Sequence, residues 1–179
     1  MNSFEISSEE LTFIRTHLKS PSLEVVLSSE FSSTSPDFRN KIQERVKTLN
    51  ISSGSQKSIS HTSLLGGFAY TREPLQIGFD LEVTDRVRPE IIQRMSTPAE
   101  LAAAPGPAHL WCAKEAIFKA LVGATQPQVI SALEVGDWKR EESQIETFCL
   151  VNLQKFKFSS GRGCILKKNQ LTMGIFTLM

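Results

Sequence analysis

Cysteine is scarce in this chain of 179 residues, and its three cysteines, Cys112, Cys149 and Cys164, form no Cys-x-x-Cys pair. An odd number of widely spaced cysteines argues against a disulfide framework and against a zinc ribbon. Long apolar runs are also missing, and the first ten residues, MNSFEISSEE, contain acids instead of the apolar segment of a signal peptide. These absences predict a soluble, cytoplasmic protein with reduced thiols and no membrane partner.

An excess of charge of either sign is missing as well. The 20 lysines and arginines nearly balance the 19 acids, which leaves a net charge of +1 and no whole-chain field of the kind that gathers nucleic acid. The sequence contains no Gly-x-Gly-x-x-Gly loop, no Walker A loop and no Gly-x-Ser-x-Gly motif. We therefore expect no nucleic-acid partner, and scattered basic side chains or backbone amides would have to hold any phosphate group.

The hydrophobic and charged fractions, 40% and 22%, are those of a globular chain. Capping boxes, apolar periodicity and β-branched runs predict the secondary structure. The expected elements are a helix over 8–19, a strand over 23–29, a helix with Ser35 as N-cap and Pro36 as its first residue that runs to Leu49, extended segments over 58–62, 66–72 and 75–83, a helix begun by the capping box at 97–100, a helix over 107–122, and strand-like runs over 129–135, 147–153, 155–158, 163–168 and 171–178. The segments 66–72 and 75–83 are predicted to form a hairpin. The mixed order of helices and strands indicates an α+β fold rather than a regular βαβ one.

Two carboxylates share one face of the predicted strand over 75–83. The apolar residues alternate onto the other face, so Asp80 and Glu82 project together. Adjacent carboxylates repel one another and raise one another's pKa unless a cation lies between them, which makes a site for a hard metal ion one explanation. A solvated outer strand face is the other.

The predicted helix over 107–122 is apolar around most of its circumference, which is typical of a buried helix. Lys114 projects from the middle of its apolar face, so its ammonium group needs a partner, an exit to solvent or an anionic ligand. Glu115 and Lys119 lie one turn apart and could form an ordinary helix-surface pair. His61 stands alone in a predicted strand, where a structural role is the simplest interpretation.

Together, the segments 58–62 (Ser-Ile-Ser-His-Thr), 77–82 (Ile-Gly-Phe-Asp-Leu-Glu) and 111–120 (Trp-Cys-Ala-Lys-Glu-Ala-Ile-Phe-Lys-Ala) resemble the three ordered motifs of the 4′-phosphopantetheinyl transferase superfamily. The forms Asp-x-Glu and Trp-x-x-Lys-Glu-Ala are closest to the surfactin-synthetase-activating (Sfp) type, here with a shortened N-terminal half. The resemblance implies a fold of two pseudo-symmetric α+β halves: residues 1–72 on the coenzyme A-binding side and residues 73–179 with the metal and catalytic motifs.

The resemblance also implies an activity. The chain would be a Mg²⁺-dependent holo-acyl-carrier-protein synthase, with Mn²⁺ as a possible substitute, of the kind that serves fatty acid biosynthesis. It would transfer the 4′-phosphopantetheine group of coenzyme A to a serine of an apo acyl or peptidyl carrier protein and release 3′,5′-ADP. The fused halves imply a monomer.

By matching position, the resemblance assigns roles to individual residues. Asp80, Glu82 and Glu115 would hold the metal ion. Glu115 would be the base for the incoming serine, directly or through a metal-bound water, and Lys119 the alternative proton carrier. Contacts to coenzyme A are assigned to Lys57, Ser60, His61, Thr62, Lys114 and Lys119.

Two departures from the family pattern lie in the first half. The Gly-Lys-Pro segment that usually precedes the histidine motif is missing, and only Ser55-Gln56-Lys57 stands near its place. A non-catalytic module that binds coenzyme A or a carrier protein is therefore the alternative function. The basic residues that hold the nucleotide 3′-phosphate cannot be matched, and the candidates are Arg15, Lys19, Arg39 and Lys41. In addition, residues 151–179 carry five basic residues and no acid, which could meet an acidic partner or simply form a solvated strand face.

Overall fold

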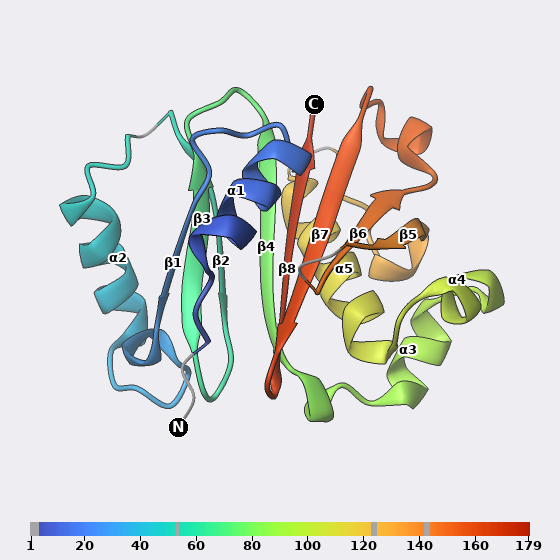
Figure 1. Cartoon of the computed structure of the whole chain (residues 1–179), viewed down its shortest axis with the longest axis horizontal. Helices are drawn as coiled ribbons and strands as arrows, with labels where there is room; N and C mark the ends of the chain where they lie inside the picture. The colour runs from blue at the N-terminus through green and yellow to red at the C-terminus, as the bar shows by residue number, and fades with distance from the viewer. Residues whose placement is uncertain (1–3, 53, 123–124, 142–143) are drawn as a thin grey trace.

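The structure is a computed structural model that describes residues 4–52, 54–122, 125–141 and 144–179. Helices and strands alternate irregularly along the chain, and the antiparallel strands form two sheets that lie side by side (Figure 1). This arrangement confirms the predicted α+β class. No helix in these ranges is long and apolar enough to cross a membrane.

The first sheet contains three strands in the order β1-β3-β2: β1 (Glu24–Ser28), β2 (Gln56–His61) and β3 (Gly66–Thr71). The helix α2 (Phe38–Thr48) covers one face, where its Ile42 packs against Phe68 and Tyr70 of β3. The helix α1 (Ser8–His17) begins at the predicted capping box, in which the Ser7 side chain and Glu10 bond each other's backbone amides. The sequence therefore specified this helix start correctly.

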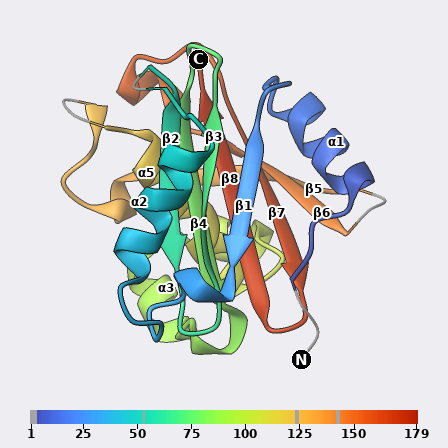
Figure 2. The same ribbon diagram turned by 90° about the vertical axis from the view of Figure 1, so that its left-hand side faces the viewer.

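The second sheet contains five strands in the order β4-β8-β7-β6-β5. Their bounds are Gln76–Val83 (β4), Val135–Arg140 (β5), Ile145–Leu150 (β6), Gly161–Lys168 (β7) and Leu171–Leu178 (β8). The long helix α5 (Pro107–Ala120) covers one face of β4, β8 and β7, and α1 lies on the opposite face (Figure 2). The remaining helical segments are α3 (Pro89–Met95), α4 (Pro98–Ala103) and the short 3₁₀ turns η1 (Ser29–Phe31), η2 (Thr84–Arg86), η4 (Ile130–Ala132) and η5 (Leu153–Phe156).

The strand β4 separates two apolar layers. Its residues Phe79 and Leu81 face α1 and join a core cluster with Ile14 and Leu18. Its other face meets α5 at very short range, because a Cβ atom on Gly78 would lie 1.7 Å from the carbonyl oxygen of Ala116. The predicted alternation of β4 is thus confirmed, but the face that carries Asp80 is covered by α5 rather than by solvent.

Side-chain hydroxyls join the two sheets where β2 meets β4. Ser58 and Ser60 of β2 point at β4, and their Oγ atoms accept hydrogen bonds from the backbone amides of Phe79 (2.9 Å) and Leu81 (3.1 Å). Among the described residues, β2 and β4 are not paired in one sheet. The hydroxyls therefore accept the β4 amides that the carbonyl oxygens of a neighbouring strand would accept within a sheet. We call this contact the serine seam.

Three predictions about the elements were wrong. The segments 66–72 and 75–83 form no hairpin, because β3 pairs with β1 and β2 while β4 pairs with β8. The connection between them is held by Glu73, which accepts hydrogen bonds from Ser20 and from the backbone amide of Ser22, and it leads the chain into the second sheet. The run 155–158 is no strand, since its first two residues belong to η5, and 129–135 contains η4 with only Val135 in β5.

The predicted start of α2, at Pro36, was also wrong. The helix begins at Phe38, and its N-cap is Asp37 in the left-handed region (φ 56°) without a side-chain capping bond. Phe38 lies edge-on to His61, with 4.5 Å between ring centroids. The left-handed backbone of Asp37 separates Ser35-Pro36 from the helix, so the predicted cap is not formed.

Candidate active site

Asp80 lies at the centre of the site, on the face of β4 that meets α5. Its side chain is only 4% exposed. The Oδ1 atom accepts hydrogen bonds from Ser60 Oγ at 2.9 Å and from Lys119 Nζ at 2.6 Å. The Oδ2 atom is buried and has no hydrogen-bond partner among the described residues. One carboxylate oxygen is therefore saturated and the other is free.

Glu82 follows on the same face of β4 and is held by Trp111 of α5, whose Nε1 donates to Glu82 Oε1 at 2.9 Å. Burial, and then the negative charges of Asp80 and Glu115, raise the pKa of Glu82 to about 7, against the opposing hydrogen bond from Trp111. Sequence reasoning used Trp111 only as part of a motif. Trp111 lies one helical turn before Glu115, and this spacing indicates that Trp111 and Glu115 project from the same face of α5.

Glu115 reaches the same region from α5. Burial and the charge of Asp80 raise the pKa of Glu115. Its carboxylate makes no hydrogen bond or ion pair within the described part of the chain. The structure thus places all three carboxylates that the sequence analysis assigned to a metal ion within electrostatic range of one another.

These three side chains do not form a closed metal cluster, since no group of three or more His, Cys, Asp or Glu residues among those described is arranged to hold an ion. Their chemistry nevertheless fits a hard divalent cation. Carboxylate oxygens are the ligands that Mg²⁺ takes, and both the free, buried Oδ2 of Asp80 and the raised pKa of Glu82 mark groups that gain from a nearby positive charge.

Basic side chains line the β2 side of the site. Burial lowers the pKa of His61, and the neighbouring charges of Lys119 and Arg39 lower it further. The Arg39 guanidinium lies 5.6 Å from the centroid of the Phe38 ring that contacts His61. Among the four candidates for the nucleotide phosphate, Arg39 is therefore the one placed beside His61, whereas Arg15 is bonded to Glu24 at 2.6 Å.

Lys114 does not belong to this basic group, which corrects the expectation that a phosphate neutralises it. Its side chain is fully buried, and Nζ lies 2.6 Å from Glu100 Oε1 and 2.5 Å from the carbonyl oxygen of Leu133. Burial lowers the pKa of Lys114, and the Glu100 carboxylate acts against this. The anion that the buried lysine needs is therefore supplied by α4.

The remaining residues predicted to contact coenzyme A lie on β2 and just after it. The Thr62 hydroxyl bonds the amides of Leu64 and Leu65 and the Leu65 carbonyl oxygen, so it is used by the turn between β2 and β3 and is not available to a ligand. Lys57 is exposed on the same face of β2 as His61. Ser60 faces Asp80 on the opposite side of the strand.

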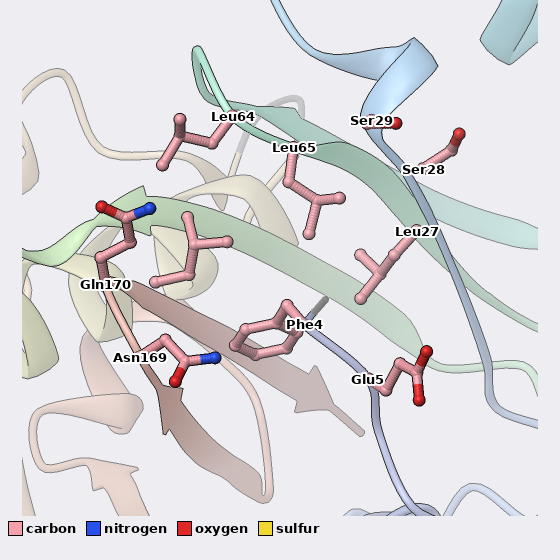
Figure 3. A pocket seen from close by; sticks show the side chains of 10 residues that line it. Phe4, Glu5, Leu27, Ser28, Ser29, Leu64, Leu65, Asn169 and Gln170 are labelled. Carbon is pink, nitrogen blue, oxygen red and sulfur yellow. The ribbon is translucent and has the colours of Figure 1, made fainter. Parts of the chain in front are cut away.

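A separate cavity of about 460 Å³ opens at the end of the molecule where the turns β2–β3 and β7–β8 meet the N-terminal segment (Figure 3). Phe4, Leu27, Leu65 and Leu171 supply its apolar wall. These residues pack with the face of β4 that looks toward α1. The cavity therefore lies on the other side of β4 from Asp80 and Glu82, and none of the predicted site residues lines it.

The basic residues of the C-terminal segment do not act as one free patch. Lys168 binds Glu10 at 2.6 Å, Lys155 binds Glu134 at 3.0 Å, and Arg162 donates to the carbonyl oxygen of His17 at 3.5 Å. Much of the positive charge that the sequence suggested for an acidic partner is thus met within the chain.

Residues 76–174 match the family model of the 4′-phosphopantetheinyl transferase superfamily. This match covers more than half of the chain. Among solved structures, the chain is similar to the holo-[acyl-carrier-protein] synthase (AcpS) of Helicobacter pylori in complex with coenzyme A, with 15% sequence identity and a TM-score of 0.42 over 57% of this chain and 99% of that one. No curated protein sequence matches significantly.

Proposed function

Because this chain belongs to the 4′-phosphopantetheinyl transferase superfamily, we propose that it transfers the 4′-phosphopantetheine group of coenzyme A to a serine of an apo acyl or peptidyl carrier protein. The observation that supports this most strongly is that Asp80, Glu82 and Glu115 lie near Lys119 at the joint between the two sheets, with His61 close enough for the charge of Lys119 to lower its pKa. Acidic residues for a cation and basic residues for phosphate are both needed to hold a pyrophosphate.

In this proposal the two parts of the chain contribute different residues to the site. Residues 1–72 form the coenzyme A side and contribute His61, Lys57 and Arg39, and residues 73–179 contribute the three carboxylates. Asp80, Glu82 and Glu115 would hold Mg²⁺, or Mn²⁺, which when bound neutralises pyrophosphate charge. Because both parts are fused in one chain, we expect the monomer to be active.

The chemistry is a displacement at phosphorus. The serine hydroxyl of the carrier attacks the phosphorus that bears the pantetheine arm, a new P–O bond forms, and the bond to the leaving 3′,5′-ADP breaks. Glu115 takes the serine proton, a role that suits a half-buried carboxylate with a raised pKa and no partner among the described residues. His61 and Lys119 stabilise the charge on the phosphate oxygens, and Lys119 is the alternative proton carrier.

The test is the intact mass of a panel of apo carrier proteins after incubation with the full chain, coenzyme A and Mg²⁺. We expect a gain of one phosphopantetheine group that is lost when EDTA removes the metal. Carriers in which the acceptor serine is replaced by alanine are the matched control. Coenzyme A binding without transfer to any carrier would contradict this proposal and support the non-catalytic module instead.

A further inference from the structure

The two hydroxyls of the serine seam make the same kind of contact with β4 but differ in their other partners. Ser58 and Ser60 lie on the same face of β2, are 8% and 7% exposed, and each accepts one backbone amide of β4. Ser60 alone also touches the site, because its hydroxyl donates to Asp80 Oδ1 at 2.9 Å. Ser58 bonds only to the backbone of Phe79.

The Ser60 hydroxyl has no capacity left for a further ligand. A hydroxyl has one hydrogen to donate and two lone pairs that accept. The hydrogen goes to Asp80, and the lone pairs face Leu81 N at 3.1 Å and Lys119 Nζ at 3.1 Å. A direct contact with coenzyme A, as the resemblance implied, would require one of these bonds to break.

The same bonds determine which oxygen Asp80 can offer. Ser60 and Lys119 both bond Oδ1, while Oδ2 is buried and has no partner among the described residues. Rotation of the carboxylate would break the two bonds to Oδ1. Because Leu81 N on β4 also fixes Ser60, the orientation of Asp80 is tied to the backbone of the strand that carries it.

We propose that Ser60 is a positioning residue that holds the Asp80 carboxylate so that one oxygen, Oδ2, is presented to the divalent cation. This inference rests on the proposed function. Hydrogen-bonding partners of metal ligands typically change metal affinity 10- to 100-fold when they are removed. Ligation through one carboxylate oxygen also suits the strict geometry of Mg²⁺, whereas Ca²⁺ often takes carboxylates through both.

The experiment compares Ser60→Ala with Ser58→Ala in the full chain. Binding of Mn²⁺ is titrated directly, by the electron paramagnetic resonance signal of the free ion, without coenzyme A, and stability is measured by urea denaturation. We expect Ser60→Ala to weaken Mn²⁺ binding about tenfold and Ser58→Ala to leave it unchanged, with similar losses of stability. Ser60→Cys keeps nearly the same shape but carries a thiol, which is a weak hydrogen-bond donor. It should therefore also weaken Mn²⁺ binding, and it replaces the alanine variant if that variant does not fold.

The outcomes separate this inference from the proposed function. Equal effects of Ser60→Ala and Ser58→Ala on Mn²⁺ affinity would overturn the positioning role and leave the transferase intact. A higher KM for coenzyme A at saturating Mg²⁺ in Ser60→Ala would overturn it as well, because Ser60 would then be a coenzyme A ligand. Wild-type protein that neither binds Mn²⁺ nor modifies a carrier would refute the proposed function itself.

Discussion

Glu115 differs from the other acidic residues of the site because nothing in the described chain bonds its carboxylate. Asp80 is held by Ser60 and Lys119, and Glu82 by Trp111. A base must be free to reach a proton, whereas a ligand benefits from being fixed. The hydrogen bonds therefore fix Asp80 and Glu82, whereas Glu115, proposed as both ligand and base, keeps the freedom to reach a proton.

Replacement of this base should separate catalysis from folding. Glu115→Gln removes the charge at nearly constant shape, so we expect carrier modification to fall below detection while the urea denaturation midpoint stays close to that of the wild type. Glu44→Gln, on the exposed surface of α2, is the control and should keep full activity. Wild-type turnover by Glu115→Gln would remove Glu115 from the mechanism.

At the scale of elements, α5 is held in place by one buried ion pair as well as by its apolar contacts. Glu100 accepts hydrogen bonds from Lys114 Nζ and from the backbone amides of Thr97 and Val135, so it links α4, α5 and β5. The pair lies inside the molecule, where loss of one partner leaves the other charge uncompensated. Lys114 thus helps to anchor α5, the helix that carries Glu115.

We therefore expect Lys114→Met to destabilise the protein by about 3 to 5 kcal/mol in urea denaturation. The double variant Lys114→Met/Glu100→Gln should recover part of this loss, because the unpaired charge is removed as well. Under conditions in which the variant is folded, its KM for coenzyme A should match that of the wild type. Unchanged stability together with a raised KM would restore the phosphate contact that the sequence suggested.

Periodicity predicted β4 and α5 well, because each element buries a regular apolar face. It therefore also predicted that Asp80 and Glu82 project together. The partner of Lys114 could not be predicted, since Glu100 lies on a separate helix and only the packing of α4 brings it close. The pairing of β4 with β8 likewise joins distant parts of the chain, so the local pattern of 66–72 and 75–83 wrongly predicted a hairpin.

At the scale of the whole molecule, Glu73 fastens the connection between the two sheets. Its carboxylate accepts hydrogen bonds from Ser20 Oγ at 2.6 Å, from Ser22 N at 3.1 Å and from Thr71 Oγ1. Burial acts to raise the pKa of Glu73, but the hydrogen bonds from Ser20, Thr71 and Ser22 outweigh it and lower the pKa from 4.5 to about 2. The ionised form is thus favoured by folding.

This pKa shift predicts the pH dependence of stability. A carboxyl whose pKa is lowered by folding stabilises the protein fully above its unfolded pKa, and this contribution is lost as the pH falls toward the folded value. The advantage of the wild type over Glu73→Gln in urea denaturation should therefore be constant near pH 7 and shrink from about pH 4.5 toward pH 2. Glu30→Gln, on an exposed turn, is the control, and a constant advantage of the wild type across that range would contradict the role of Glu73.

The serine seam has a consequence for how this chain can be rebuilt. A backbone ladder joins two strands whatever side chains they carry, but here the hydrogen bonds between β2 and β4 come from the side chains at positions 58 and 60. A chimera that takes its first half from a relative, or a version split into two chains at the connection after β3, keeps these hydrogen bonds only if it retains hydroxyls at both positions. Positions 58 and 60 are therefore the first to compare when halves are exchanged.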